Sequence, residues 1–263
     1  MHNPIARALE RGASLLHKAA VRVKWWGVTR ELDATPELAA LYARYHASPE
    51  GKWTIGKDDL VNLYRFVRTH KRTNILELGM GVGLSTAAMA LALKHSGSNG
   101  RVTGVEQMAK CVAIATDLLP EDLRPYVEMV EAPPHAFQIP GVSRYHYFCG
   151  YDWTPPPGTR YDMVFLDGPT GWLEDGLLVS PDNADLYHFL PYLAEGCLVY
   201  VDGRRGAVKV AERYLGKYLE VIERDSEYTV LRVTVPPDTL RDIQIYDTKL
   251  EPLKGIVYFP KES

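Results

Sequence analysis

The stretch Ile75-Leu-Glu-Leu-Gly-Met-Gly-Val-Gly-Leu-Ser85 decides the fold of this chain. Its apolar start predicts a buried strand over residues 74–78, and residues 85–94 predict a helix. Gly79, Gly81 and Gly83 let the backbone turn sharply between the two and let a ligand approach the main chain closely. A glycine loop at the carboxyl end of a strand is typical of a nucleotide site in an open α/β sheet.

Strand and helix patterns alternate on both sides of this loop. We therefore expect an α/β fold with a doubly wound, mostly parallel seven-stranded sheet. The last two strands are close enough in sequence to form an antiparallel hairpin. The other expected strands span residues 101–106, 126–130, 161–166, 197–201, 219–224 and 228–235, and the other expected helices span residues 35–46, 57–70, 109–119, 185–193 and 207–218.

The length of 263 residues suits one α/β domain with extensions. We expect an N-terminal helical extension or lid over residues 1–56, a catalytic domain over residues 57–240 and a C-terminal tail over residues 241–263. Residues 133–160 interrupt the alternation with six prolines and a cluster of aromatic residues. This insertion is either a functional lid or binding loop, or a surface segment that packs its own aromatic side chains.

Composition restricts the partners and the compartment. A formal net charge of −3 gives no basic excess for binding a nucleic-acid backbone. Cys111, Cys149 and Cys197 are too few and too widely spaced for a disulfide framework or a zinc pattern, which indicates a reducing compartment. The sequence shows no apolar run of membrane-spanning length and no signal-peptide pattern. We therefore expect a cytoplasmic protein.

The N-terminal region predicts a basic amphipathic helix over residues 4–24, followed by Trp25-Trp26. Such a helix could lie on a membrane surface. It could equally pack on the core or on a second subunit. Residues 4–26 are therefore a candidate contact for a peripheral membrane or for a dimer.

Three features bear on which ligand the glycine loop binds. Leu84 occupies the position of the third glycine of dinucleotide-binding loops. Glu77, expected at the mouth of the site, would repel a diphosphate but attract the ammonium or sulfonium group of S-adenosylmethionine. Glu106 ends the next strand, where a carboxylate can accept hydrogen bonds from ribose hydroxyls, although nicotinamide sites share this feature.

Residues 54–235 resemble class I S-adenosylmethionine-dependent methyltransferases, most closely the catechol-type and caffeoyl-type O-methyltransferases. The resemblance implies a Rossmann-like fold and methyl transfer to a hydroxyl group. The Asp-Gly-Pro sequence after the fourth strand is also similar to plant glucuronoxylan O-methyltransferases. The matching segments are residues 76–85, 105–106, 161–167 and 198–202.

The resemblance also implies roles for individual residues. Glu77, Gly79 and Ser85 are expected to hold the methionine end, and the backbone of the Trp53-Thr54-Ile55 lid segment is expected to contact the methionine carboxylate. Asp167 is also expected to contact the cofactor. Glu106 would bind the ribose, and Ala132 and Pro133 would lie beside the adenine. Gly81 and Gly83 either belong to the cofactor site or serve only the turn.

Asp167 and Asp202 are the candidate catalytic residues. Each follows an apolar strand, so both are expected at the carboxyl edge of the sheet near the transferable methyl group. The corresponding family positions are metal ligands, but Gly203 replaces the asparagine that follows the second aspartate. The family's lysine after the first aspartate is also absent. These departures favour a metal-independent site with one aspartate as the base, and Mg²⁺ is the alternative.

Several further residues are candidates for binding or activating the acceptor. Arg204 and Arg205 could hold an acidic substrate or be solvated, and His135, His146 and His188 are further candidate bases. We expect O-methylation of a small molecule or a sugar. The alternatives are a nicotinamide-dependent oxidoreductase and a non-catalytic subunit that keeps the fold.

Overall fold

The computed structural model describes residues 27–138, 148–169, 172–174, 177–179, 182–235 and 246–247. The N-terminal helix expected over residues 4–24, His146 and most of the expected C-terminal tail lie outside these ranges. None of the helices in the described ranges is long and apolar enough to cross a membrane.

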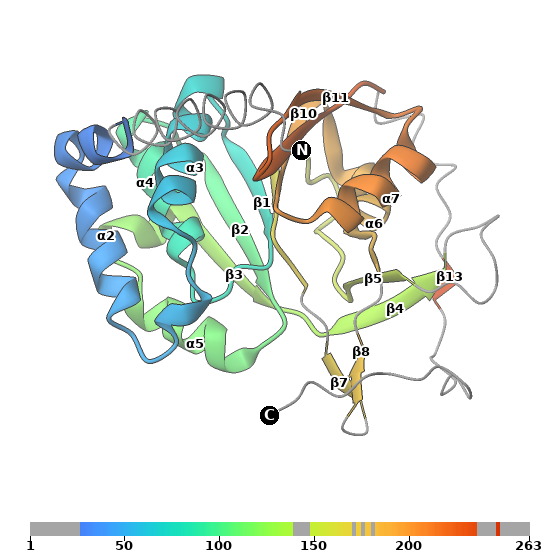
Figure 1. Cartoon of the computed structure of the whole chain (residues 1–263), viewed down its shortest axis with the longest axis horizontal. Coiled ribbons are helices and arrows are strands. Elements are labelled where there is room, and N and C mark those ends of the chain that lie inside the picture. Colours follow the sequence, from blue (N-terminus) through green and yellow to red (C-terminus); the bar gives the residue numbers. More distant parts are fainter. Residues whose placement is uncertain are drawn as a thin grey trace, which may run out of the picture.

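A seven-stranded sheet forms the centre of the molecule, in the order β11-β12-β10-β6-β1-β2-β3 (Figure 1). β1 lies between β6 and β2, and the pairs from β10 to β3 are all parallel. β12 pairs antiparallel with both β10 and β11, which confirms the expected terminal hairpin. The strands are β1 (Asn74–Leu78), β2 (Arg101–Glu106), β3 (Val127–Glu131), β6 (Tyr161–Leu166), β10 (Leu193–Asp202), β11 (Leu219–Arg224) and β12 (Tyr228–Val233).

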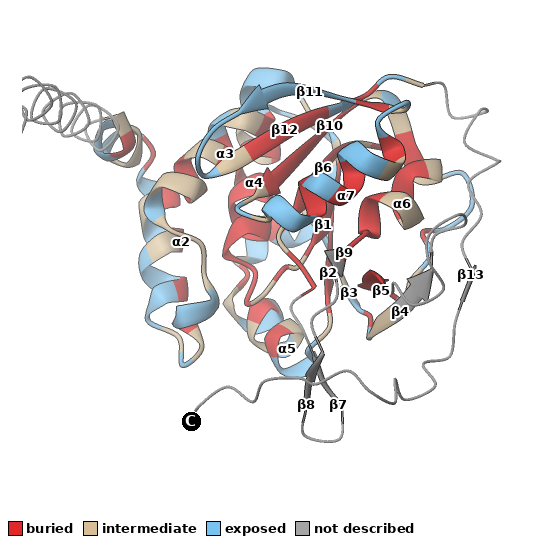
Figure 2. Ribbon diagram, turned by 45° about the vertical axis from the view of Figure 1, so that its right-hand side comes forward, coloured by how far each residue is buried: buried red, intermediate tan, exposed pale blue. Residues whose placement is uncertain are grey.

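Helices cover both faces of this sheet, as expected for a doubly wound fold. One face carries α2 (Pro36–His46), α3 (Lys57–His70), α4 (Leu84–His95) and α5 (Ala109–Leu118), whereas the other carries α6 (Asp185–Phe189) and α7 (Arg205–Leu215) (Figure 1). The central strands are buried on both sides (Figure 2). Alternate strand residues therefore enter two separate cores, with Ile75 in the first and Leu76 in the second.

Some helix boundaries differ from the expected ones. The helix predicted over residues 185–193 ends at Phe189 and continues as the short 3₁₀ helix η3 (Leu190–Tyr192), which contains Pro191. The helix predicted over residues 207–218 begins at Arg205 and ends at Leu215. Thr35 precedes α2 as expected, but its side chain makes no capping hydrogen bond.

The insertion contains two strands that the sequence did not indicate. β4 (Pro134–Gln138) and β5 (Phe148–Tyr151) pair antiparallel in a second, four-stranded sheet of order β13-β4-β5-β9. Its outer strands are β9 (Asp182–Asn183) and β13 (Tyr246–Asp247). Phe148 is fully buried and packs with Ala184 and Val210, and this apolar contact anchors the segment on the domain. A separate hairpin joins β7 (Trp172–Glu174) to β8 (Leu177–Val179).

Candidate active site

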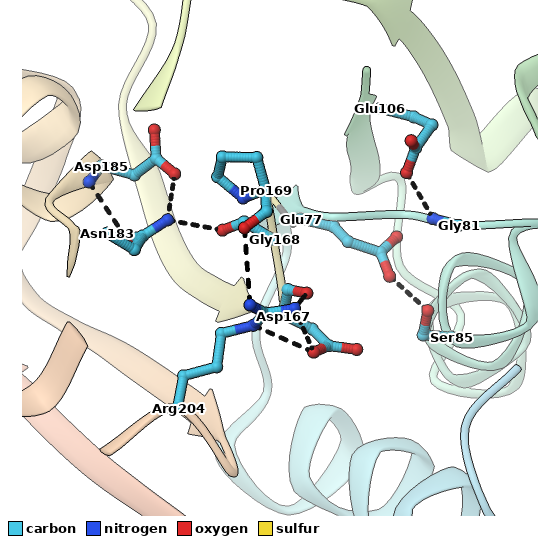
Figure 3. A network of polar contacts seen from close by, with 10 residues as sticks. All are labelled: Glu77, Gly81, Ser85, Glu106, Asp167, Gly168, Pro169, Asn183, Asp185 and Arg204. Atoms are coloured by element: carbon cyan, nitrogen blue, oxygen red, sulfur yellow. Dashed lines mark hydrogen bonds and ion pairs between the residues drawn. The ribbon is translucent and has the colours of Figure 1, made fainter. Parts of the chain in front are cut away.

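A cleft of about 380 Å³ opens where β1, β2, β6 and β10 end. The carboxyl ends of parallel strands are the usual ligand site of such sheets. Residues from five separate segments line it, and Figure 3 shows the polar contacts around it. The residues that line it are Lys52, Trp53, Thr54, Ile55, Gly56, Asp59, Gly79, Gly81, Glu106, Gln107, Met108, Asp167, Gly168, Asp202 and Arg204.

The glycine loop forms one wall of the cleft. Gly79 has a φ of 96°, and a Cβ added there would lie 2.3 Å from the backbone nitrogen of Gly168. A Cβ added to Gly81 would lie 3.0 Å from the Trp53 carbonyl oxygen. A Cβ on Gly83 would instead meet Ala115 of α5 at 2.9 Å. Gly79 and Gly81 therefore face the cleft, whereas Gly83 lies in the packing between helices.

Glu106 connects the loop to the end of β2. Its Oε2 accepts a hydrogen bond from the Gly81 N–H at 2.8 Å, and its Oε1 accepts from the N–H groups of Gln107 and Met108 at 2.9 and 3.0 Å. Burial raises the pKa of this carboxyl group, and the backbone donors oppose the increase. The carboxylate is thus fixed at the cleft, where it can accept hydrogen bonds from a polar ligand.

Glu77 does not stand at the mouth of the site, contrary to the sequence interpretation. Its carboxylate is fully buried and accepts a hydrogen bond from the Ser85 hydroxyl group (Figure 3). It accepts a second one from the hydroxyl group of Thr86, which also belongs to the first turn of α4. Burial raises its pKa to about 7, against the effect of these hydroxyl groups. Neither Glu77 nor Ser85 lines the cleft.

The segment expected to form a lid lines the cleft. Residues 51–53 form the 3₁₀ helix η1 (Gly51–Trp53), and Trp53 is half exposed. The Thr54 hydroxyl donates to the Gly51 carbonyl at 2.6 Å and lies 2.9 Å from Nε2 of His46. An ion pair between Glu50 and Lys110 ties the segment to α5. The Thr54 side chain therefore stabilises the segment itself.

Asp167 forms an ion pair that the sequence did not reveal. The Arg204 Nε and Nη2 atoms both lie 3.1 Å from Oδ1 of Asp167. The same guanidinium donates to the Asp167 carbonyl and to the Pro169 carbonyl, the latter at 3.4 Å. Burial raises the Asp167 pKa, whereas Arg204 lowers it. Arg204 is therefore engaged in the wall of the cleft and is not a solvated loop residue.

Asp202 lies at the end of β10, in the same cleft as Asp167. Burial, followed by the negative charge of Asp167, raises its pKa to about 6, and Arg204 opposes this increase. Its neighbour Gly203 adopts a φ of 57° and donates its N–H to the Glu227 carbonyl at 2.7 Å. Asp202 is thus half-buried, with a pKa raised by its surroundings.

The donor set around these aspartates does not fit a divalent metal ion. One carboxylate oxygen of Asp167 is already paired with the positively charged Arg204 guanidinium. Gly203, which follows Asp202, has no side-chain oxygen to offer a metal ion. Within the described ranges, no three His, Cys, Asp or Glu side chains are grouped so as to hold a metal.

Other sequence candidates lie away from the cleft. Ala132 is buried, and its N–H donates to the Glu106 carbonyl at 2.9 Å without lining the cleft. His188 of α6 lies 2.9 Å from the Trp153 carbonyl and packs edge-on against His135 of β4. Arg205 donates to the Ser226 carbonyl at 3.3 Å. None of the histidines in the described ranges lines the cleft.

The sequence interpretation missed Asp59, Asn183 and Asp185. Asp59 comes from the first turn of α3 and lines the cleft. Asn183 and Asp185 form a buried polar network beside Gly168 (Figure 3). For Asn183 and Asp185, the signal in the sequence was the Asp-Asn-Ala-Asp segment at the start of a predicted helix. Such a segment is equally typical of a helix-capping turn.

Comparison with known proteins agrees with this geometry. Residues 76–203 match the model of a family described as a methyltransferase domain, which confirms the resemblance at that level. No curated protein matches this chain. A candidate O-methyltransferase from Klebsiella pneumoniae superposes with a TM-score of 0.51 at 17% identity, covering 79% of this chain and 96% of its own.

Two further solved structures have the same fold. A candidate caffeoyl-CoA O-methyltransferase from Staphylococcus aureus covers 80% of this chain and 98% of its own, with 16% identity and a TM-score of 0.50. An SAH-bound methyltransferase from Podospora anserina covers 75% of this chain and 88% of its own, with 12% identity and a TM-score of 0.50. These matches confirm the Rossmann-like methyltransferase fold.

Proposed function

We propose that this chain, whose residues 76–203 form a methyltransferase domain, transfers a methyl group from S-adenosylmethionine to a hydroxyl group of a small molecule or a sugar. One observation carries the proposal. The Glu106 carboxylate, held against Gly81, faces the same cleft as Asp167 and Asp202. A ribose-binding group and a candidate base thus share one site.

The residues of the cleft fit this cofactor. Gly79 and Gly81 of the glycine loop line the cleft, and Glu106 can accept hydrogen bonds from the ribose hydroxyls. Four carboxylates line the cleft, from Asp59, Glu106, Asp167 and Asp202, whereas its cations are Lys52 and the ion-paired Arg204. This charge favours a sulfonium cation over a diphosphate. When bound, the cofactor supplies a methyl group that is already activated for transfer.

Asp202 is the proposed general base. A hydroxyl acceptor must lose its proton as it attacks, and a base titrating near the working pH is best suited to take it. The Asp202 pKa of about 6 meets this requirement. Arg204 holds the Asp167 carboxylate, which leaves Asp167 to shape the cleft and to balance charge. The cleft would hold an acceptor close to the cofactor, and positioning of this kind can supply about 7–11 kcal/mol.

Calorimetric titration tests the cofactor assignment. We expect S-adenosylhomocysteine to bind and NAD not to bind. The Glu106→Gln variant should bind S-adenosylhomocysteine about 10- to 100-fold more weakly, because a hydrogen bond to a charged group contributes about 1.5–3 kcal/mol. Glu128→Gln, a change to an exposed carboxylate on β3, is the control and should bind like the wild type. Binding of NAD without S-adenosylhomocysteine would contradict the proposal.

Metal dependence is tested with an acceptor that the wild type methylates, found by screening phenols and sugars with methyl-labelled cofactor. We expect EDTA to leave the turnover rate unchanged and added Mg²⁺ not to raise it, because Arg204 already neutralises Asp167. Mg²⁺-restored activity after chelation would show that the aspartates bind a metal despite this ion pair.

A further inference from the structure

A buried polar network lies behind the cleft, in the layer that contains α6. Asp185, the first residue of α6, is fully buried. Its Oδ1 accepts the Tyr151 N–H at 2.8 Å, and its Oδ2 accepts the Asn183 Nδ2 amide at 2.7 Å. The Asn183 Oδ1 in turn accepts the Asp185 N–H at 3.2 Å. These bonds fix the orientation of the Asn183 amide.

The Asn183 amide makes a second contact, with the wall of the cleft. Its Nδ2 also donates to the Gly168 carbonyl at 2.7 Å (Figure 3). Arg204 donates to the carbonyls of Asp167 and Pro169. Three successive carbonyl groups, at residues 167, 168 and 169, thus accept hydrogen bonds from two side chains on different elements. A loop that served only as a connection would not need such constraint.

The segment that is held has little freedom to move. The Asp167 N–H donates to the Leu78 carbonyl at 2.8 Å, and Gly168 lies against the backbone of Gly79. A Cβ added to Gly168 would approach the Gly79 Cα at 2.4 Å and the Tyr151 hydroxyl at 2.6 Å. The position of the Gly168 carbonyl therefore sets how Asp167 and the glycine loop face each other across the cleft.

We propose that Asn183 and Asp185 are positioning residues that fix the Gly168 carbonyl and thereby place the Asp167 carboxylate in the methyl-transfer site. This inference rests on the proposed function. A buried carboxylate is costly, and apolar residues of similar size usually stabilise a core as well or better. Support by a second layer of hydrogen bonds is how proteins hold reacting groups in place, since a displacement of about 1 Å can cost about 100-fold in rate.

Asp185→Asn separates this role from a purely structural one. The substitution keeps the shape of the side chain, and removal of the buried charge offsets part of the stability lost with the hydrogen bonds that it disrupts. The new amide would place one donor against the donor of Asn183. Relief of that conflict requires the Asn183 amide to turn, which removes its hydrogen bond to Gly168. Asn183→Ala is the second variant and removes the same bond directly. Asn74→Ala is the matched control. The Asn74 side-chain amide also donates to a backbone carbonyl, that of Arg160, but at the amino end of β1, away from the cleft.

Hydrogen–deuterium exchange on the S-adenosylhomocysteine complexes gives a readout that needs no acceptor. In Asp185→Asn and Asn183→Ala we expect faster exchange in the peptide covering residues 163–169, with unchanged exchange in β2. Asn74→Ala should leave the 163–169 peptide unchanged. Exchange in that peptide equal to the wild type in both variants would overturn the inference.

Turnover supplies the second readout. With an acceptor that the wild type methylates, we expect kcat of Asp185→Asn to fall about 10- to 100-fold. Its affinity for S-adenosylhomocysteine should stay close to that of the wild type, because Glu106 and Gly81 are untouched. A kcat equal to that of the wild type would contradict the inference and leave the proposed function intact. Failure of the wild type itself to bind S-adenosylhomocysteine would count against the proposed function.

Discussion

Replacing Asp202 by asparagine is expected to lower kcat by about 10²- to 10⁴-fold, the contribution typical of a general base. Asparagine has nearly the same shape, so it keeps the packing at the end of β10 but cannot take a proton. Affinity for S-adenosylhomocysteine should be nearly unchanged, because the Glu106 side of the cleft is not altered. Steady-state kinetics with methyl-labelled cofactor and calorimetric titration measure the two quantities separately.

The pH profile identifies the same carboxyl group. Burial and the charge of Asp167 raise the Asp202 pKa to about 6, and only the ionised form can act as a base. The wild-type kcat should therefore rise with pH through a limb near pH 6 and level off above it. The residual activity of Asp202→Asn should lack this limb. Asp152→Asn, a change to an exposed carboxylate after β5, should retain both the limb and the rate. A normal kcat in Asp202→Asn would show that another group takes the proton.

The main sheet could be predicted from the sequence because its strands are buried on both faces. The strand over residues 161–166 is an apolar run bounded by aspartates, and its predicted limits agree with β6. The glycine loop and the placement of Glu106, Asp167 and Asp202 at one edge follow from the same pattern, since parallel strands bring their carboxyl ends together. Local sequence patterns are sufficient to place a side chain when its position depends only on one strand and the turn that follows it.

The orientation of Glu77 could have been inferred but was not. Strand side chains alternate between faces, so Glu77 shares a face with Ile75, which packs in the core that includes α4. The helix that follows the loop presents Ser85 and Thr86 to that face. A carboxylate on this face therefore forms hydrogen bonds with these hydroxyl groups and does not reach a ligand in the cleft. The electrostatic preference for a sulfonium therefore rests on the carboxylates that line the cleft.

The contacts of Arg204 and Asn183 could not be predicted in this way. Arg204 meets Asp167 across 37 positions of the chain, and Asn183 meets Gly168 across 15 positions. Asn183 is placed by the parallel pairing of β9 with β5, inside a second sheet that the sequence did not indicate. Charged and amide side chains in loops can be solvated or engaged, and only the tertiary arrangement decides between the two.

Gly79→Ala is expected to destabilise the protein and to abolish cofactor binding. A residue with a side chain costs about 1–2 kcal/mol in the left-handed region, and Gly79 has a φ of 96°. The added Cβ would also lie 2.3 Å from the Gly168 nitrogen and 2.5 Å from the Asp167 carbonyl carbon. These are backbone atoms held by Asn183 and Arg204, so no side-chain rotation can relieve the clash. Overpacking of this kind typically costs about another 1–3 kcal/mol.

Gly97→Ala separates the cost of a side chain at positive φ from the cost of the steric clash. Gly97 has a φ of 62°, but a Cβ added there meets no atom within 4 Å. Its substitution should lower the free energy of unfolding by about 1–2 kcal/mol and leave affinity for S-adenosylhomocysteine unchanged. Gly79→Ala should lower the free energy of unfolding further, because relief of the clash requires the backbone of residues 167–168 to move. That movement would also change the shape of the cleft. Denaturant unfolding and calorimetric titration of both variants give the comparison. Equal stability and equal affinity in the two would mean that the approach of Gly79 to Gly168 constrains neither the fold nor the site.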